Sequence, residues 1–206
     1  MYSFIIFDVD GTLIDTENAV MESYQNVILE EFGRRFTEKE LSPAYGIPTK
    51  QALELLGFKD IDAAGEQYFK YLFKAFAEVK PFKGIVEMLE ELRIRKVAGG
   101  VVTSRNRSEV ANDPSLQNLL KYFSHVICAE DTQKHKPEAE PALKLIEQAD
   151  VDISKAIYLG DTYYDYMCAK NAGVKFALAA WGAKSTLNIE AAYILEEPKE
   201  LLALVT

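Results

Sequence analysis

The stretch Phe4-Ile5-Ile6-Phe7-Asp8-Val9-Asp10-Gly11-Thr12 decides the fold of this chain. It completes a short run of β-favouring residues, Tyr2 to Phe7, and then turns abruptly acidic. Because consecutive positions of the run are apolar, both faces of the segment must be covered, as in a strand inside a parallel sheet. The stretch therefore predicts a buried strand with two carboxyl groups at its carboxyl end.

Similar apolar runs recur along the rest of the chain. They are Val97 to Val102, Val126 to Ala129, Ala156 to Leu159 and Val174 to Ala179, and helical patterns such as Ile85 to Arg95 and Pro141 to Ala149 lie between most of them. Short strands that alternate with helices are typical of a parallel sheet covered on both faces. We predict an α/β fold with a Rossmann-like parallel sheet.

The pattern changes between about Thr16 and Val79, where only helical periodicity remains. Two apolar helix faces occur here: one consists of Val20, Tyr24, Val27 and Ile28, in a helix that Gly33 can end, and the other of Tyr68, Leu72, Phe73 and Phe76. Between them, Thr37 and Glu40 have the spacing of a capping box. Thr49 opens a short helical segment, Gln51 to Leu56, that Gly57 can end. Pro81 and Gly84 mark the return to the sheet. We predict an all-helical cap domain at 15–81, inserted into a core domain made of 1–14 and 82–206.

Composition restricts the class of partner. The chain has 206 residues, 49% hydrophobic and 27% charged, and a formal net charge of −9. This is the composition of a folded globular protein, and its negative field repels nucleic acid and anionic membrane surfaces. A small phosphorylated metabolite stays possible, because cations can gather locally around it.

Cysteine usage and hydropathy predict a cytoplasmic location. Cys128 and Cys168 lack the paired spacing of a zinc or redox motif, so we expect reduced structural thiols. The first apolar run is interrupted at Asp8, too soon for a signal-peptide core, and no later stretch is long enough to cross a bilayer.

Polar residues follow four of the predicted strands. They are Asp8 with Asp10, Thr103-Ser104-Arg105, Lys134-His135-Lys136-Pro137, and Gly160-Asp161 with Asp165 one helical turn later. Taken singly, each has an ordinary explanation as a turn, a helix cap or a solvated lysine. Side chains at the carboxyl ends of parallel strands share one crevice, however, so their joint placement indicates a site.

This combination of residues suits phosphoryl transfer. The reaction requires a nucleophile, a cation that offsets the repulsion between nucleophile and phosphate, and donors that hold the phosphate oxygens. Asp8 supplies a carboxylate nucleophile, Asp161 a ligand for Mg²⁺, and Lys136 a positive charge. Asp10 suits a proton shuttle, provided that crowding by anions raises its pKa toward neutrality, and Gly11 exposes backbone N–H groups to phosphate.

The ordered set of motifs resembles the haloacid dehalogenase superfamily over nearly the whole chain. The similarity rests on Asp8-Val9-Asp10-Gly11-Thr12, Thr103, Lys136-Pro137 and Gly160-Asp161-x-x-x-Asp165. Three further segments resemble the phosphoglycolate phosphatase and pyrophosphatase branch, which has a helical cap after the first motif; they are Asn171-Ala172-Gly173-Val174, Ala180-Trp181-Gly182 and Pro198 to Leu204.

The resemblance implies a role for each matching residue. Asp8 would be nucleophile and metal ligand, and Asp10 the general acid/base that also binds metal through its backbone carbonyl. Thr103 with its neighbour Ser104, Gly11 and Lys136 would hold the phosphate. Asp161 would bind Mg²⁺, and Asp165 would stabilise the metal site without binding the ion itself.

Other residues keep two interpretations open. Lys134 competes with Lys136 for the phosphate role, although only Lys136 directly precedes Pro137, as the motif has it. In the segment Gly46-Ile47-Pro48-Thr49-Lys50, Thr49 and Lys50 either contact the leaving group or form a solvated helix start. Arg105 and Arg107 either meet a second anionic group of the substrate or are exposed arginines with no role.

Several functional classes therefore remain. The main expectation is a Mg²⁺-dependent phosphatase acting through an aspartyl phosphate on a small monoester or anhydride, such as a phosphoglycolate-like compound, pyrophosphate or a sugar phosphate. A phosphomutase of the same superfamily is the nearest rival, and Thr12 disfavours it because such relatives often have a bulkier apolar residue there. A phosphorylation-switched signalling module and a silent binding protein are the others. Both a monomer and a homodimer are compatible with the sequence.

Overall fold

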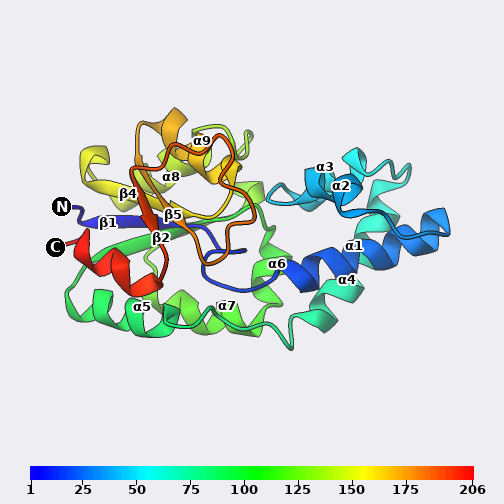
Figure 1. Ribbon diagram of the computed structural model, residues 1–206, viewed down its shortest axis with the longest axis horizontal. Helices are drawn as coiled ribbons and strands as arrows, with labels where there is room; N and C mark the ends of the chain where they lie inside the picture. Colours follow the sequence, from blue (N-terminus) through cyan, green and yellow to red (C-terminus); the bar gives the residue numbers. More distant parts are fainter.

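A parallel sheet of six strands forms the centre of the molecule (Figure 1). The computed structural model describes residues 1–206. The strands are β1 (Phe4–Phe7), β2 (Ala98–Val102), β3 (Val126–Ile127), β4 (Ala156–Gly160), β5 (Lys175–Ala179) and β6 (Tyr193–Leu195), in the order β3-β2-β1-β4-β5-β6. The predicted parallel α/β fold is confirmed. Only β6 was not predicted, because its three residues give too short a pattern.

Helices cover both faces of the sheet, as the doubly apolar first strand requires. On one face lie α5 (Ile85–Ile94), α6 (Arg107–Ala111), α7 (Pro114–Leu119) and a 3₁₀ helix, Pro198–Ala203; on the other lie α8 (Glu140–Ala149) and α9 (Tyr163–Ala172). Shorter 3₁₀ turns are Ser42–Ala44, Leu120–Tyr122, Ala129–Asp131 and Ile153–Lys155. In β1, Ile5 and Phe7 pack into the first of these layers, and Phe4 and Ile6 into the second.

Four helices between β1 and β2 form a separate helical insertion. They are α1 (Glu17–Phe32), α2 (Glu38–Leu41), α3 (Thr49–Leu55) and α4 (Ile61–Ala75), and they lie beyond the carboxyl ends of the strands (Figure 1). The insertion has its own apolar core, in which the rings of Tyr24 and Tyr68 stack with centroids 4.4 Å apart. The all-helical insertion is confirmed, whereas the domain boundaries at 14/15 and 81/82 stay a prediction.

The local helix signals in the insertion act as expected. Gly33 ends α1 in the left-handed region with φ of 68°, and Thr37 and Glu40 form the expected capping box. Thr49 begins α3, but Pro48 occupies the N-cap position and no side chain caps that helix end. The hydroxyl of Thr49 is therefore available for another partner.

Two further expectations concern the whole chain. Cys128 and Cys168 are free and buried, as expected of structural thiols. Among the helices, none combines the length and the apolar character that crossing a membrane requires.

The register of the sheet sets the position of the site. Phe7, the last residue of β1, pairs with Val101 of β2 and with Leu159 of β4. These three strands consequently end at one edge, and the residues that follow them meet there. The helical insertion covers the same edge.

Candidate active site

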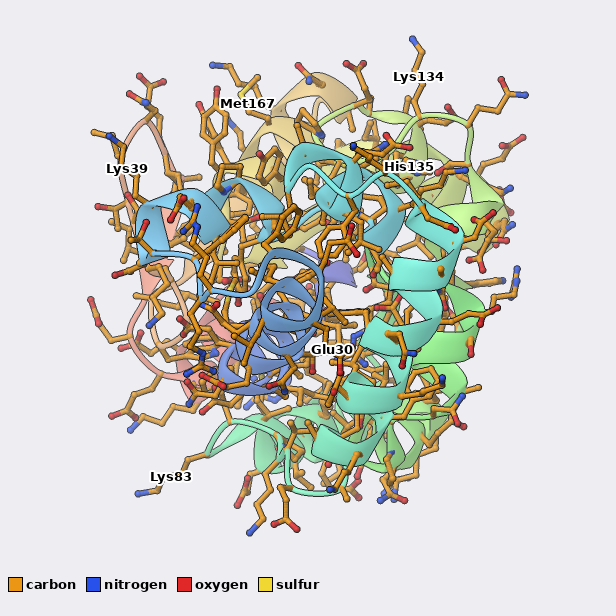
Figure 2. All side chains as sticks on the ribbon, turned by 90° about the vertical axis from the view of Figure 1, so that its right-hand side faces the viewer. Glu30, Lys39, Lys83, Lys134, His135 and Met167 are labelled. Atoms are coloured by element: carbon orange, nitrogen blue, oxygen red, sulfur yellow. The ribbon has the colours of Figure 1, made fainter.

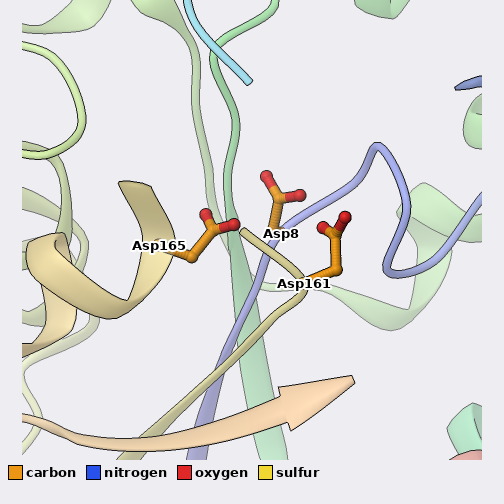
Figure 3. A group of neighbouring side chains, drawn as sticks. All are labelled: Asp8, Asp161 and Asp165. Atoms are coloured by element: carbon orange, nitrogen blue, oxygen red, sulfur yellow. The ribbon is translucent and has the colours of Figure 1, made fainter. Parts of the chain in front are cut away.

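Three buried carboxyl groups meet at the carboxyl edge of the sheet (Figure 3). Asp8 follows β1, Asp161 follows β4, and Asp165 lies in the first turn of α9. One carboxylate oxygen of each lies within 4.8 Å of those of the other two, and the residues are 3%, 2% and 0% exposed, respectively. The structure thus brings together side chains from two distant loops and a helix.

Lys136 supplies the positive charge of this cluster. Its Nζ lies 2.5 Å from Asp8 Oδ1 and 2.7 Å from Asp165 Oδ1, and the side chain is buried. Lys134 is exposed and points away from the molecule, while its backbone N–H donates to Glu140 (Figure 2). The structure therefore places Lys136, and not Lys134, beside Asp8.

Burial and mutual repulsion dominate the electrostatics of the cluster. Burial and the nearby Asp165 raise the pKa of Asp8 to about 7, although Lys136 acts in the opposite direction. Burial, Asp8 and Asp165 also raise the pKa of Asp161 well above its usual range. Burial lowers the pKa of Lys136, but the charges of Asp165 and Asp8 outweigh this, and the net shift is upward. One ammonium group beside three buried carboxyl groups, of which it contacts Asp8 and Asp165, leaves the site short of positive charge.

Asp161 fits the coordination of a divalent cation. Its Oδ1 accepts a hydrogen bond of 3.0 Å from the Thr12 hydroxyl, whereas its buried Oδ2 has no partner. A buried carboxylate oxygen without a donor is costly unless a cation satisfies it, and Mg²⁺ prefers hard oxygen ligands. Gly11 leaves room for this oxygen, because a Cβ at that position would lie 2.2 Å from Asp161 Oδ2. The donor set and the missing charge both fit a divalent metal ion.

The side chain of Asp10 belongs to a different cluster. The Thr16 hydroxyl donates to Asp10 Oδ1 at 2.5 Å, and Arg105 donates from Nη2 to Oδ1 at 2.8 Å and from Nε to Oδ2 at 2.9 Å. Burial favours the neutral acid, but the Arg105 guanidinium outweighs it and lowers the pKa of Asp10. The expected upward shift is therefore wrong, since a cation and not a group of anions surrounds this side chain. The expected metal contact through the Asp10 backbone carbonyl stays a prediction.

Arg105 is neither exposed nor open to a substrate anion in this structure. It is 4% exposed, pairs with Asp10 on one side and with Asp113 on the other, and its guanidinium carbon lies 4.6 Å above the Phe76 ring. The expectation of an exposed arginine is wrong for Arg105. Arg107, by contrast, lies at the surface, where it pairs with Asp131.

Thr103 and Ser104 lie at the same sheet edge but have different environments. Thr103 is buried, and its Oγ1 accepts a hydrogen bond of 3.2 Å from the Arg105 backbone N–H. The Ser104 hydroxyl donates to the Gly46 carbonyl oxygen of the helical insertion at 2.9 Å. Ser104 therefore links the sheet edge to the insertion.

The two candidates from the insertion both border an outer groove, but only Thr49 also borders a cavity beside Asp10. Thr49 is buried, donates to Glu109 Oε1 at 3.1 Å, and borders a cavity of about 40 Å³ with Asp10 and Ser104. Lys50 is exposed and borders an outer groove of about 800 Å³ that also contains His135. The structure thus brings Thr49, and not Lys50, to the cavity beside Asp10.

Sequence reasoning gave no place in the site to several residues that the structure brings there, among them Trp181 and Gly182, which it had noted only for their family resemblance. The Trp181 indole N–H donates to the Thr12 carbonyl oxygen at 2.9 Å. Gly182 packs so closely on the same loop that a Cβ there would lie 1.7 Å from the Gly11 carbonyl oxygen. Glu109 and Asp113 were also missed. Asn106-x-x-Glu109 and Asp113-Pro114 are helix-start signals that sequence alone shows, but such signals do not reveal what else a capping side chain contacts.

Glu109 allows a prediction about pH-dependent stability. Burial raises the pKa of Glu109 from 4.5 to about 7, although the Asn106 backbone N–H and Arg105 lower it. Between these pH values the folded state keeps a proton that the unfolded chain has released, so the free energy of unfolding falls as pH rises. A Glu109→Gln variant, which mimics the neutral acid, should match the wild type near pH 4.5 and exceed its free energy of unfolding by about 1–3 kcal/mol at pH 8. Urea unfolding at both pH values checks this, and an equal difference at both would contradict it.

Comparison with known proteins identifies sequence relatives of this chain. Residues 5–179 match the family model described as haloacid dehalogenase-like hydrolase. The pyrophosphatase PpaX of Bacillus velezensis is 31% identical over 202 residues, which cover 96% of this chain and 94% of that protein. The full-length coverage means that the similarity includes both the sheet and the helical insertion.

Two solved structures have the same architecture. A Lactobacillus plantarum protein described as a candidate phosphoglycolate phosphatase has a TM-score of 0.88 and 27% identity, with 99% of both chains covered. A candidate β-phosphoglucomutase from Thermotoga maritima has a TM-score of 0.75 and 25% identity, covering 98% of this chain and 97% of that one. Structures with this fold are therefore described with more than one type of reaction, and fold similarity alone does not identify the reaction.

Proposed function

Because the chain belongs to the haloacid dehalogenase-like hydrolase family, we propose that it is a metal-dependent phosphatase with Asp8 as its nucleophile. The observation that carries the proposal is the Lys136 ammonium group, which lies 2.5 Å from Asp8 Oδ1 within a cluster of three buried carboxyl groups. A carboxylate approaches a phosphate only where cations offset the repulsion between them. The cluster has one such cation and an unpartnered Asp161 oxygen for another.

The proposed substrate is a small phosphate monoester or anhydride. Phosphoglycolate-like compounds, pyrophosphate and sugar phosphates are the candidates, in keeping with the names of the relatives. A cavity of about 40 Å³ lies beside Asp10, where residues of the helical insertion meet the sheet edge. We further propose that residues 15–81 act as a cap over this cavity, with Thr49 facing the leaving group, and that the enzyme works in the cytoplasm.

The reaction has two steps. In the first, an oxygen of Asp8 forms a bond to phosphorus, the bond between phosphorus and the leaving oxygen breaks, and that oxygen takes a proton from the fraction of enzyme in which Asp10 is protonated, a fraction that Arg105 keeps small. In the second, water attacks the aspartyl phosphate, Asp10 takes the proton of the water, and the bond between phosphorus and Asp8 breaks to release inorganic phosphate. Lys136 and Thr103 would hold the phosphate oxygens through both steps, whereas the N–H of Gly11 donates to the Ile14 carbonyl oxygen at 3.0 Å.

The metal ion in this proposal is Mg²⁺. Asp8, Asp161 and the Asp10 backbone carbonyl would hold it, with Asp165 supporting the cluster through Lys136. When bound, Mg²⁺ offsets negative charge on the phosphate and on Asp8. The small number of protein ligands is consistent with Mg²⁺, because this ion usually keeps several bound waters.

A phosphomutase is the second candidate, favoured by the similarity to the Thermotoga maritima structure. Thr12 favours the hydrolase, because phosphomutases of this superfamily often have a bulkier apolar residue at this position; here the Thr12 hydroxyl donates to Asp161 Oδ1. The two candidates differ in the acceptor of the phosphoryl group, which is water in one case and a sugar phosphate hydroxyl in the other.

Metal removal tests the proposed function. With p-nitrophenyl phosphate as substrate, chelation should lower kcat/KM at least about 100-fold, and excess Mg²⁺ should restore it, since several kcal/mol of charge stabilisation are lost with the ion. Turnover that survives chelation would refute the metal-dependent mechanism. Stoichiometric phosphate retention without turnover would indicate a signalling module, and transfer to a sugar phosphate a mutase.

A further inference from the structure

Asp10 lies at the end of a chain of buried charged groups that extends away from the nucleophile. Arg105 donates to both oxygens of Asp10, and its Nη1 donates to Asp113 Oδ2 at 2.8 Å. Arg105 and Asp113 are 4% and 0% exposed, respectively. Such pairs are rigid when both partners are themselves held, because a guanidinium fork fixes the geometry of the carboxylate that it binds.

Arg105 is held along its whole length. Its backbone N–H donates to Thr103 Oγ1, and its carbonyl oxygen accepts from the Ala129 N–H. The Phe76 ring covers one face of the guanidinium. The head group therefore has a fixed position between Asp10 and Asp113.

Asp113 uses its two oxygens for two different partners. Oδ1 accepts from the backbone N–H groups of Ser115 and Leu116 at 2.8 and 3.1 Å, which caps the start of α7. Oδ2 accepts from Arg105. A serine or asparagine would satisfy the helix start equally well, so the cap alone does not explain a buried aspartate here.

We propose that Asp113 is a positioning residue, which acts through Arg105 to fix the carboxylate of Asp10 for proton transfer. The inference rests on the proposed function, because it assigns a purpose to Asp10 in that reaction. A displacement of about 1 Å in a catalytic group is enough to slow a reaction about 100-fold, so a fixed support for Asp10 has a kinetic effect.

The two steps of the reaction should depend on this support to different extents. With p-nitrophenyl phosphate the leaving group departs as a stable anion and needs no proton, so formation of the aspartyl phosphate does not require a positioned Asp10. The attack of water does require it, because a proton must be removed from that water. Loss of Asp113 should therefore slow the second step selectively.

The test compares Asp113→Asn with the wild type in rapid-mixing experiments with p-nitrophenyl phosphate and Mg²⁺. Asn keeps the cap of α7 and the size of the side chain but removes the charge that holds Arg105. We expect a burst of about one equivalent of p-nitrophenol at an unchanged rate, a steady-state kcat lowered about 10- to 100-fold, and an acid-stable phosphoenzyme that accumulates.

Asp60→Asn is the matched control. Asp60 also caps a helix, accepting from the Ala63 N–H at 3.0 Å, but it is exposed and has no cationic partner. This variant should behave as the wild type. If Asp113→Asn reduces the amplitude of the burst in proportion to kcat, the residue only stabilises the fold, and the inference is wrong.

A double variant tests whether Asp113 acts through Arg105. In an Arg105→Gln background, Asp113→Asn should lower kcat less than twofold further, because the intermediate partner is already lost. Independent, multiplicative effects would overturn the inference. A wild type that shows neither Mg²⁺-dependent turnover nor a phosphoenzyme would overturn the proposed function itself, which is a separate outcome.

Discussion

Replacing Asp8 by asparagine should lower the rate of phosphate ester hydrolysis at least about 10⁴-fold, because a carboxamide does not displace the leaving group from phosphorus. The variant should also form no acid-stable phosphoenzyme. Steady-state hydrolysis of p-nitrophenyl phosphate and acid quenching of the reaction measure the two effects. Residual turnover within 100-fold of the wild type would rule out Asp8 as nucleophile.

The same substitution should make the protein more stable at pH 8 in metal-free buffer. Burial and Asp165 raise the pKa of Asp8 from 3.8 to about 7, so the folded state resists ionisation of this group and the free energy of unfolding falls as pH rises through that range. Asparagine removes this unfavourable contribution, and its stabilising effect should disappear toward pH 4. Asp150→Asn is the control, because Asp150 lies exposed at the end of α8 with φ of 51°, a conformation that asparagine tolerates.

Replacing Lys136 by methionine should damage both stability and activity. Its ammonium group is the partner of Asp8 and Asp165, and the variant would leave buried carboxylates without a counter-charge. Loss of one partner of a buried ion pair costs about 3–5 kcal/mol, and loss of an electrostatic contact to the transferred group costs about 10²- to 10³-fold in kcat. Urea unfolding and steady-state kinetics at pH 8 measure these quantities.

The Lys134→Met variant is the control for this prediction. Lys134 is two residues away in sequence but exposed at the surface, so its replacement should change kcat less than twofold. The deficit in stability of Lys136→Met should shrink at pH 5, because Asp8 then takes up a proton in the folded state. If both lysine variants lose activity equally, the assignment of the phosphate contact to Lys136 is wrong.

The sequence was most informative where one physical requirement dominates. The uninterrupted apolar run of β1 needs cover on both faces, and together with the alternation of apolar runs and helical patterns this predicts the layered parallel sheet. Gly33 and the pair Thr37 and Glu40 act locally, so the helix boundaries that they predict are confirmed. Strand β6 was missed because three residues carry no usable periodicity.

Sequence reasoning was least reliable about the partners of charged side chains. It expected anions around Asp10 because the neighbouring motif residues are acidic, whereas the structure brings in Arg105 from the end of β2. The burial of Arg105 depends on Phe76, which lies at the end of the helical insertion, and on Asp113, which begins α7. Such an environment is a property of three distant segments, and no single segment of the sequence shows it.

The central position of β1 in the sheet affects how the chain folds during its synthesis. Residues 4–7 pair with residues 98–101 on one side and with residues 156–159 on the other, so this strand leaves the ribosome long before either neighbour exists. Until then the apolar side chains of β1 have no neighbouring strands or helices to pack against. A nascent chain that exposes such a segment is prone to aggregate with other nascent chains or to be bound by chaperones. Shortened chains that stop before residue 156 should consequently accumulate as aggregates, whatever the stability of the finished molecule.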